Sequence, residues 1–290
     1  MKKVLITGAN SYIGTSFENY VKKLYPSDFS VETVDMIDGT WREKSFSGYD
    51  SVFHVAGIAH QKETKKNSSS YYKINRDLAV ETAKKAKADG VKQFVFLSTM
   101  SVYGMESGNI KLSTLPNPKN NYGKSKLQAE EIIREFESDN FKVCVLRPPM
   151  VYGNGCKGNY NALKKIALKS PLFPKVNNNR SMIYIYNLCE FIRMIIVNDD
   201  NGLYYPQNSE YVSTTKMVEL VCLSNGKKIK FTRIFNGILA ILKHIIPTVN
   251  KAFGSLTYDL EMSKYSSNYN VTSFEDSIIK TELKTGESNA

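Results

Sequence analysis

The N-terminal half of the chain alternates short apolar runs with longer helical patterns. We predict strands at 3–7, 30–35, 51–56, 93–98 and 142–147, and helices at 12–24, 72–89 and 121–138. Strands that are buried on both faces and separated by helices of more than about ten residues are typical of a parallel sheet covered on two sides. The sequence therefore predicts an α/β fold with a doubly wound parallel sheet, the Rossmann arrangement.

The alternation weakens after residue 149, which predicts a smaller C-terminal lobe. We expect a first domain at 1–155 and a second at 156–290, with the chain partly interleaved between them. Helices are predicted near 160–170 and 187–197, and an apolar run covers 182–186. A further apolar stretch, 234–246, stops at Pro247 and predicts a buried helix or a subunit contact, with weak peripheral membrane association as the alternative. The polar tail from 280 to 290 is expected to fray.

Composition narrows the choice of partners. The 290 residues are 42% apolar with a net charge of +11, and the longest apolar runs fall short of the roughly 18 residues of a membrane span. The basic N-terminus leads into an apolar run that ends at Gly8, too early for a secretory signal, so we expect a cytoplasmic protein. Positive charge suits nucleic acid, an anionic membrane surface or a small anionic substrate. Because the lysines are scattered, nucleic acid is disfavoured.

Cysteine and histidine spacing predicts no metal site. The four cysteines are widely spaced, without a Cys-x-x-Cys pair, and the three histidines add no zinc-ligand pattern. We expect reduced cysteines, at least two of them in core elements.

A glycine turn follows the first predicted strand. Gly8 and Gly14 bound this turn, which runs into the helix at 12–24. Glycine lets a backbone approach a pyrophosphate, and a helix N-terminus presents amide groups and partial positive charge to it. Asp35 ends the second strand, 21 residues after Gly14, where a carboxylate accepts hydrogen bonds from the adenosine ribose and repels a 2′-phosphate. The alternative is that Asp35 caps a turn.

Tyr122 and Lys126 form a second constellation. They are four residues apart in a helical pattern and so share one helix face, where an ammonium can lower the pKa of a phenol. The strand at 93–98 ends in hydroxyl residues, Ser98 and Thr99, directly before this segment. The carboxyl end of a strand and the following helix meet at the crevice where such sheets bind ligands.

These motifs together resemble the extended short-chain dehydrogenases/reductases, in the nucleotide-sugar epimerase/dehydratase family with its UDP-glucose 4-epimerases. The matching segments are ITGANSYIG (6–14), Asp35, FHVAGIAH (53–60), YYKINRDLAVETAKKA (71–86) with Asn75, FLSTMSVYG (96–104), YGKSKLQAE (122–130), LRPPMVYG (146–153) and RSMIYIYNL (180–188). They occur in family order over roughly 190 residues.

The resemblance implies a site residue by residue. Tyr122 would be the general acid/base, Lys126 would hold the nicotinamide ribose and lower the tyrosine pKa, and Thr99 would hydrogen-bond the same substrate oxygen, with Ser98 as the less favoured candidate. Residues implied to contact NAD are Gly8, Ser11, Tyr12, Ile13, Gly14, Asp35, Ala56, Gly57, Ile58, Tyr122, Lys126 and Pro148. The residues implied to bind the substrate are Thr99, Asn159 and Arg180. Arg180 would hold the nucleotide-sugar diphosphate, and Asn159 would contact the nucleotide or cap a turn.

The chain departs from the family pattern in two places. Ser11 replaces a glycine of the phosphate turn, which we expect to loosen cofactor binding, and the interval from Asp35 to Tyr49 is too short for a helix and a long strand. We therefore expect the adenine side to be rebuilt around Thr40 and Trp41.

The implied activity is that of an NAD-dependent nucleotide-sugar 4-epimerase of polysaccharide biosynthesis, acting through a 4-keto sugar, with a UDP-sugar as substrate. A nucleotide-4-keto-6-deoxy-sugar 4-reductase is the alternative, followed by a non-catalytic dinucleotide-binding protein; a homodimer is left open. A 4,6-dehydratase is not expected. Met100 and Ser101 stand where dehydratases of the family carry an Asp-Glu pair, and neither exchanges a proton near neutral pH.

Overall fold

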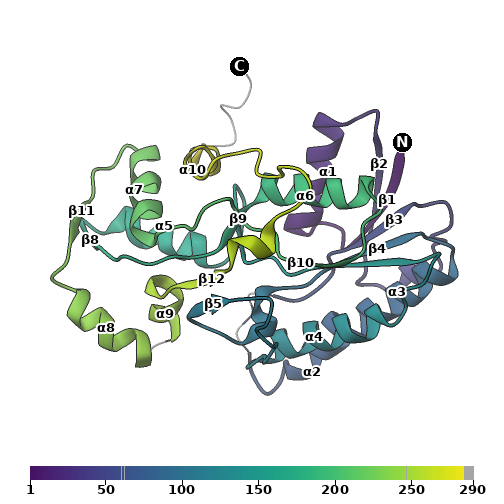
Figure 1. Cartoon of the computed structure of the whole chain (residues 1–290), viewed down its shortest axis with the longest axis horizontal. Helices are drawn as coiled ribbons and strands as arrows, with labels where there is room; N and C mark the ends of the chain where they lie inside the picture. Colours follow the sequence, from purple (N-terminus) through teal and green to yellow (C-terminus); the bar gives the residue numbers. More distant parts are fainter. Residues whose placement is uncertain (60, 62, 246, 284–290) are drawn as a thin grey trace. The chain divides into compact units, whose positions relative to one another are not determined.

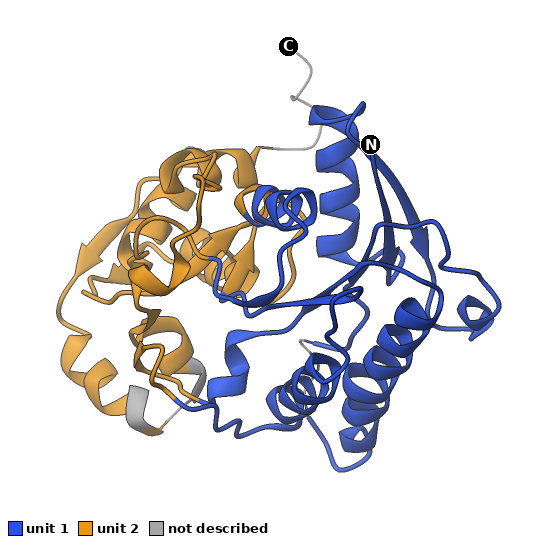
Figure 2. Cartoon of the chain, turned by 45° about the vertical axis from the view of Figure 1, so that its right-hand side comes forward, with its two compact units in different colours: residues 1–104, 115–149, 188–206 blue, residues 105–114, 150–187, 207–290 orange. Residues whose placement is uncertain are grey.

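A computed structural model of the chain (Figure 1) describes residues 1–59, 61, 63–245 and 247–283. His60 of the third quoted motif, Ile246 of the apolar stretch and the end of the expected frayed tail lie outside the described residues. The chain forms two compact units, coloured separately in Figure 2. Unit 1 comprises 1–104, 115–149 and 188–206, and unit 2 comprises 105–114, 150–187 and 207–290.

Unit 1 is built on a six-stranded parallel sheet of order β10-β6-β4-β3-β1-β2. Its strands are β1 (Lys2–Thr7), β2 (Phe29–Val34), β3 (Ser51–His54), β4 (Gln93–Leu97), β6 (Lys142–Leu146) and β10 (Gly202–Tyr204). The strand order reverses at β1, which pairs with β2 on one side and β3 on the other. Ligands bind at such reversals, outside the carboxyl ends of the strands. The predicted doubly wound α/β fold is confirmed.

Helices cover both faces of this sheet (Figure 1). On one face lie α1 (Tyr12–Leu24) and α6 (Ile185–Val197), whose first three residues belong to unit 2. The other face carries α2 (Ser68–Tyr71), α3 (Leu78–Ala88) and α4 (Asn121–Arg134). Between α2 and α3 the chain is π-helical over η2 (Tyr72–Asp77). Small alanines on α3 and α4 let both helices pack closely on the large apolar side chains of β3, β4 and β6.

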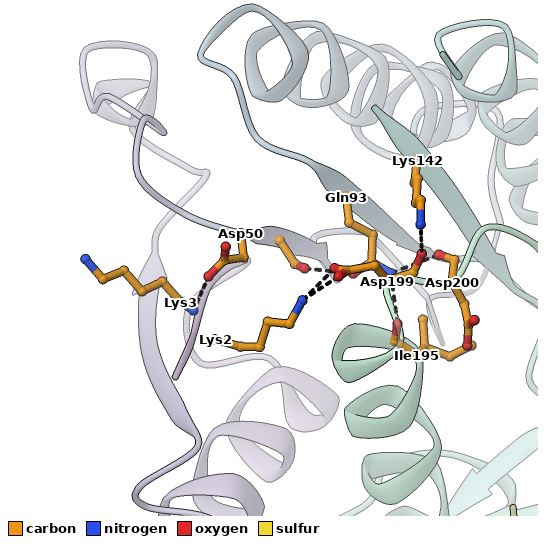
Figure 3. Close-up of polar contacts among 9 residues, drawn as sticks. Lys2, Lys3, Asp50, Gln93, Lys142, Ile195, Asp199 and Asp200 are labelled. Carbon is orange, nitrogen blue, oxygen red and sulfur yellow. Dashed lines mark hydrogen bonds and ion pairs between the residues drawn. The ribbon is translucent and has the colours of Figure 1, made fainter. Parts of the chain in front are cut away.

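The amino ends of the strands are tied to the loop after α6 (Figure 3). The Gln93 amide donates hydrogen bonds to the carbonyl oxygens of Ile195 and Asp200, at 2.9 and 2.8 Å. Asp199 accepts from Lys2 Nζ with its carboxylate and from Lys142 Nζ with its backbone oxygen, at 2.7 and 2.8 Å. The amino ends of the strands therefore have a structural role, and the carboxyl ends are left for ligands.

Unit 2 contains three two-stranded parallel sheets and several helices. The pairs are β7 (Met150–Tyr152) with β9 (Met182–Tyr184), β8 (Leu172–Pro174) with β11 (Lys230–Thr232), and β5 (Gly108–Ile110) with β12 (Leu256–Tyr258). Its further helices are α5 (Asn159–Lys169), α7 (Thr214–Ser224), α8 (Asn236–Ile245), α9 (Pro247–Phe253) and α10 (Phe274–Glu282). The four cysteines are unpaired and buried, as predicted.

The apolar stretch at 234–246 forms α8, as its pattern predicts, but the helix is not buried in the chain. Ile238, Ile241 and Ile245 are exposed, so the helix is not buried by the described part of the chain, and the alternative of a subunit contact stays a prediction. Among the described residues, no helix combines the length and the apolar character needed to cross a membrane.

Candidate functional site

The glycine turn after β1 is packed too closely for side chains at its two glycines. Gly8 has φ +115°, and a Cβ there would lie 2.8 Å from the Ala56 nitrogen. At Gly14 a Cβ would lie 3.0 Å from Ile6 and 2.5 Å from Ser11 Oγ. The turn is joined to the end of β2, because the amides of Gly8 and Ala9 donate to the Val34 carbonyl oxygen.

Ser11 has a structural reason to replace the glycine. It is the N-cap of α1, and its hydroxyl accepts a hydrogen bond from the Gly14 amide at 3.3 Å. A serine at this position stabilises the helix start. The same bond uses one of the amide groups that a helix N-terminus offers to an anion. Tyr12 and Ile13 belong to the first turn of the same helix.

Asp35 follows β2 directly and is exposed. One carboxylate oxygen accepts a hydrogen bond from the Ile37 amide at 2.8 Å, so Asp35 does cap a turn. This bond leaves the carboxylate charge in place beside the glycine turn. The short segment that follows contains a 3₁₀ turn, η1 (Thr40–Arg42). Trp41 is buried in the core against Phe46, and the rebuilding of the adenine side around Thr40 and Trp41 stays a prediction.

Asn75 holds the loop after β3. Its side-chain oxygen accepts from the Ile58 amide at 2.8 Å and its nitrogen donates to the Ile58 carbonyl at 3.1 Å. The same nitrogen donates to Ser125 Oγ in α4 at 3.2 Å. A Cβ on Gly57 would lie 2.9 Å from Asn75 Oδ1 and 3.3 Å from Lys126 Nζ. Residues 56–58 are thus fixed against α4, and sequence reasoning had assigned Asn75 no role.

Thr99, Tyr122 and Lys126 lie together at the carboxyl end of β4. The side chains of Thr99 and Tyr122 are hydrogen-bonded to each other. Lys126, one helical turn after Tyr122, donates to the Leu97 carbonyl oxygen at 2.9 Å and lies 4.7 Å from the centre of the Phe96 ring. All three are on well-defined elements: Thr99 caps η3 (Met100–Tyr103), and Asn120 caps α4.

The electrostatics of this group differ from the expectation. Burial raises the pKa of Tyr122, while the hydrogen bond with Thr99 lowers it. Burial lowers the pKa of Lys126 to about 8, opposed by the charge of Glu130. Because the Lys126 ammonium is directed at Leu97, it does not lower the pKa of Tyr122 as expected. A lowered tyrosine pKa therefore requires a positive charge from outside the chain, such as an oxidised nicotinamide.

Ser98 is hydrogen-bonded to a buried ion pair. Its hydroxyl donates to Glu130, whose carboxylate accepts three hydrogen bonds from the Arg147 guanidinium, at 3.2, 3.0 and 2.5 Å. Arg147 also donates to the Tyr103 hydroxyl at 2.9 Å. The buried Pro148 accepts from the Met100 amide through its carbonyl at 3.0 Å, which fixes the start of η3. Thr99 is therefore the better-placed hydroxyl of the two candidates.

Glu63 is a site neighbour that sequence reasoning missed. Its carboxylate accepts from the Tyr122 amide at 3.0 Å and from Asn121 Nδ2 at 3.2 Å. A carboxylate at a helix N-terminus is favourable, so Glu63 stabilises the turn that carries Tyr122. It stands in a loop without periodicity, and the sequence contains no signal for this contact.

Arg180 and Asn159 lie in unit 2. Arg180 Nη1 donates to the Gly254 carbonyl oxygen at 3.0 Å, no carboxylate among the described residues pairs with it, and burial lowers its pKa. A partly buried guanidinium without a counter-ion favours an anionic ligand. Asn159 is the exposed first residue of α5; the N-cap is Gly158, so the turn-capping alternative is not observed.

Comparison with known proteins agrees with this geometry. The model of the NAD dependent epimerase/dehydratase family matches residues 4–205. The chain belongs to this family. An enzyme of Escherichia coli O157:H7, N-acetyl-alpha-D-glucosaminyl-diphospho-ditrans,octacis-undecaprenol 4-epimerase, is 29% identical over 78% of this chain and 73% of its own length. A Vibrio cholerae UDP-glucose 4-epimerase is 29% identical over 78% of this chain and 76% of its own.

Solved structures of other proteins share the fold. A dTDP-4-dehydrorhamnose reductase from Clostridium acetobutylicum ATCC 824 superposes with a TM-score of 0.73 at 18% identity, covering 96% of this chain and 98% of the other. A UDP-glucuronic acid 4-epimerase from Bacillus cereus, in complex with NAD, gives 0.69 at 18% identity, with 97% of each chain covered. The fold is thus common to epimerases and reductases.

The residues present fit the family's cofactor, NAD. The glycine turn leads into the N-terminus of α1, which offers amide groups to a pyrophosphate, and Asp35 supplies a negative charge where the adenosine ribose would lie. As a member of an NAD-dependent family, the chain has NAD as its cofactor, as the sequence predicted.

Proposed function

We propose that this chain is an NAD-dependent nucleotide-sugar 4-epimerase. The observation that carries the proposal is the grouping of Thr99, Tyr122 and Lys126 at the carboxyl end of β4, beside the loop at 56–58. A phenol, a hydroxyl and an ammonium on rigid elements at this edge suit proton transfer to and from an alcohol.

Each residue has a distinct role. Tyr122, as its phenolate, takes the proton of the sugar 4-hydroxyl and later returns it, while the Thr99 hydroxyl holds the same oxygen in position. Lys126 binds the nicotinamide ribose, close to Gly57. When bound, NAD would supply the acceptor for the hydride of the sugar C4 carbon and would later serve as its donor. The 4-keto sugar must turn over between these two transfers, so that the hydride returns to its other face.

The substrate is a sugar diphosphate, with a UDP-sugar as our first choice. The names of the Vibrio cholerae and Escherichia coli relatives describe substrates with different carriers, and a sugar joined to a diphosphate is common to both. Arg180, which has no carboxylate partner among the described residues, supplies a cation for that diphosphate, and Asn159 at the start of α5 is a second candidate contact. We expect the enzyme in the cytoplasm.

The cap at Ser11 favours a second candidate, a nucleotide-4-keto-6-deoxy-sugar 4-reductase. An epimerase retains its cofactor through each cycle, but a reductase must exchange it. Because Ser11 Oγ occupies the Gly14 amide, the turn offers one amide fewer to the pyrophosphate. Weaker binding of the dinucleotide would suit exchange.

One experiment separates the two candidates. The purified chain is incubated with UDP-galactose or UDP-N-acetylgalactosamine without added NAD, and the sugar configuration is read by NMR. C4 epimers are expected. A chain that leaves these sugars unchanged but consumes NADH stoichiometrically with a 4-keto-6-deoxy sugar is the reductase. Formation of a 4-keto-6-deoxy product from a hexose would instead indicate a dehydratase, despite Met100 and Ser101.

A further inference from the structure

Helix α8 presents an apolar face to solvent. Ile238, Ile241 and Ile245 follow one another at spacings of three and four residues, which places them on one side of the helix. Their side chains are 60%, 64% and 69% exposed. Ile234 and Phe235, directly before the helix, are also exposed. We call these five residues the isoleucine patch.

The rest of α8 is mixed: Leu239 and Leu242 are apolar, whereas Asn236, Lys243 and His244 are polar. Leu239 and Leu242 are half-buried, so they cover the side of the helix that the rest of the unit shields. An amphipathic helix normally packs its apolar side against the protein, but here Ile238, Ile241 and Ile245 lack cover among the described residues. A contiguous exposed apolar surface marks an interaction site more often than scattered single residues do.

The segment around the patch is purely cationic. Residues 220–258 contain six lysines and arginines and no aspartate or glutamate. Lys228, Lys230 and Arg233 are exposed directly before the patch, and Lys251 is exposed on α9, which packs beside α8 (Figure 1). Lys227 is already satisfied, because it donates to three carbonyl oxygens at the end of α5.

We propose that the isoleucine patch docks this chain on the surface of an anionic lipid bilayer. Helix α8 lies in the plane of the interface, with the isoleucines at the boundary of headgroups and acyl chains. The neighbouring lysines and arginine contact anionic headgroups. With ten residues, α8 is suited to lie on a membrane and not to cross it.

The positive charge around the isoleucine patch favours a bilayer over a second copy of the chain as its binding partner. In a two-fold dimer, the same surface meets itself, so the cations around one patch would face those around the other. The segment at 220–258 has no acidic residue to compensate them. An anionic bilayer offers both an apolar layer and opposite charge. The proposal does not rest on the proposed function, because the patch contains no residue of the catalytic group.

The test is flotation of the full chain with vesicles of phosphatidylcholine containing about one third phosphatidylglycerol, compared with pure phosphatidylcholine. We expect binding to the anionic vesicles and at least about tenfold weaker binding to the neutral ones. The double variant Ile238→Ser/Ile241→Ser should bind anionic vesicles at least about tenfold less than the native chain. The control is Leu223→Ser, an equally exposed leucine on α7 of the same unit, which should bind as the native chain does.

The serine variants keep the net charge of +11, so they distinguish the patch from general attraction of a basic protein to anionic lipid. Undiminished binding of the double variant, with circular dichroism like that of the native chain, would overturn the proposal. Sedimentation velocity without lipid gives a second check. A native dimer that the double variant converts to a monomer would assign the patch to a second copy instead, and an unchanged sedimentation coefficient supports the bilayer.

Discussion

The Lys126 ammonium donates a hydrogen bond to the carbonyl oxygen of Leu97 at 2.9 Å, and this bond joins the middle of α4 to the last residue of β4. The same ammonium lies over the Phe96 ring and close to Gly57. A buried charge is thus held by a carbonyl and an aromatic face before any ligand is bound. A positive charge is therefore held beside the loop at 56–58 in the ligand-free chain. Its burial lowers the free energy of unfolding, and this effect should depend on pH.

Because burial lowers the pKa of Lys126 from its ordinary 10.5 to about 8, the unfolded chain binds the extra proton between these two values. The contribution of Lys126 to stability therefore rises with pH from about 8 to 10.5, by about 3 kcal/mol. We expect the free energy of unfolding of the ligand-free native chain to rise by this amount relative to Lys126→Met. Chemical denaturation at a series of pH values measures it.

Lys124→Met is the matched control, since Lys124 is exposed on the same helix. The free energy of unfolding of Lys124→Met should change with pH by the same amount as that of the native chain. If the free energy of unfolding of Lys126→Met shows the same pH dependence as that of the native chain, the pKa of Lys126 is not lowered by folding.

Replacing Tyr122 by phenylalanine should lower turnover by about a hundredfold or more, because the proton-transferring phenol is lost. Binding of NAD, followed by calorimetry, should change little. Tyr20→Phe is the control: this tyrosine is also buried, but its hydroxyl donates to Glu190 on the other face of the sheet. Full activity of Tyr122→Phe would mean that another group moves the proton.

Sequence patterns located the strands of unit 1 because most of them are uniformly buried and apolar. β10 escaped prediction, since its three residues are only half-buried and form no apolar run. The meeting of Thr99 with Tyr122 follows from a general property of parallel sheets, whose carboxyl ends share one edge. The contacts of Glu63 and Asn75 depend on how an aperiodic loop and a π-helical segment fold back, and no local pattern encodes them.

A buried glutamine at the opposite edge of the sheet supports the fold. Gln93→Leu removes the partner of two backbone carbonyls (Figure 3). It also removes the partner of Ser51 Oγ, which donates to Gln93 at 2.7 Å. We expect the variant to lose about 2 to 4 kcal/mol of unfolding free energy, measured by urea denaturation. At low temperature its turnover should be native, since this edge is remote from Thr99. Lys3→Ala is the control: its exposed side chain makes no hydrogen bond among the described residues and only a weak electrostatic interaction with Glu32, so stability should be unchanged. A native denaturation midpoint for Gln93→Leu would refute the structural role of Gln93.

Asp35 should make the chain prefer NAD over NADP by at least about tenfold, because a 2′-phosphate would meet an uncompensated carboxylate. Asp35 also accepts a hydrogen bond from the Ile37 amide, so a change at this position can act through charge or through the turn. Asp35→Asn separates the two effects: the amide oxygen can still accept from Ile37, but the negative charge is gone. We expect Asp35→Asn and Asp35→Ala to narrow the preference to a similar extent in equilibrium binding of both dinucleotides.

The matched control is Asp38→Ala, three residues further on, where an exposed aspartate caps Thr40 within the same segment. It should retain the native preference for NAD. If Asp35→Ala alone narrows the preference and Asp35→Asn does not, the turn and not the charge determines the choice of dinucleotide. Equal affinities of the native chain for NAD and NADP would remove Asp35 from the ribose site altogether, and the exposed carboxylate would then have only its turn-capping role.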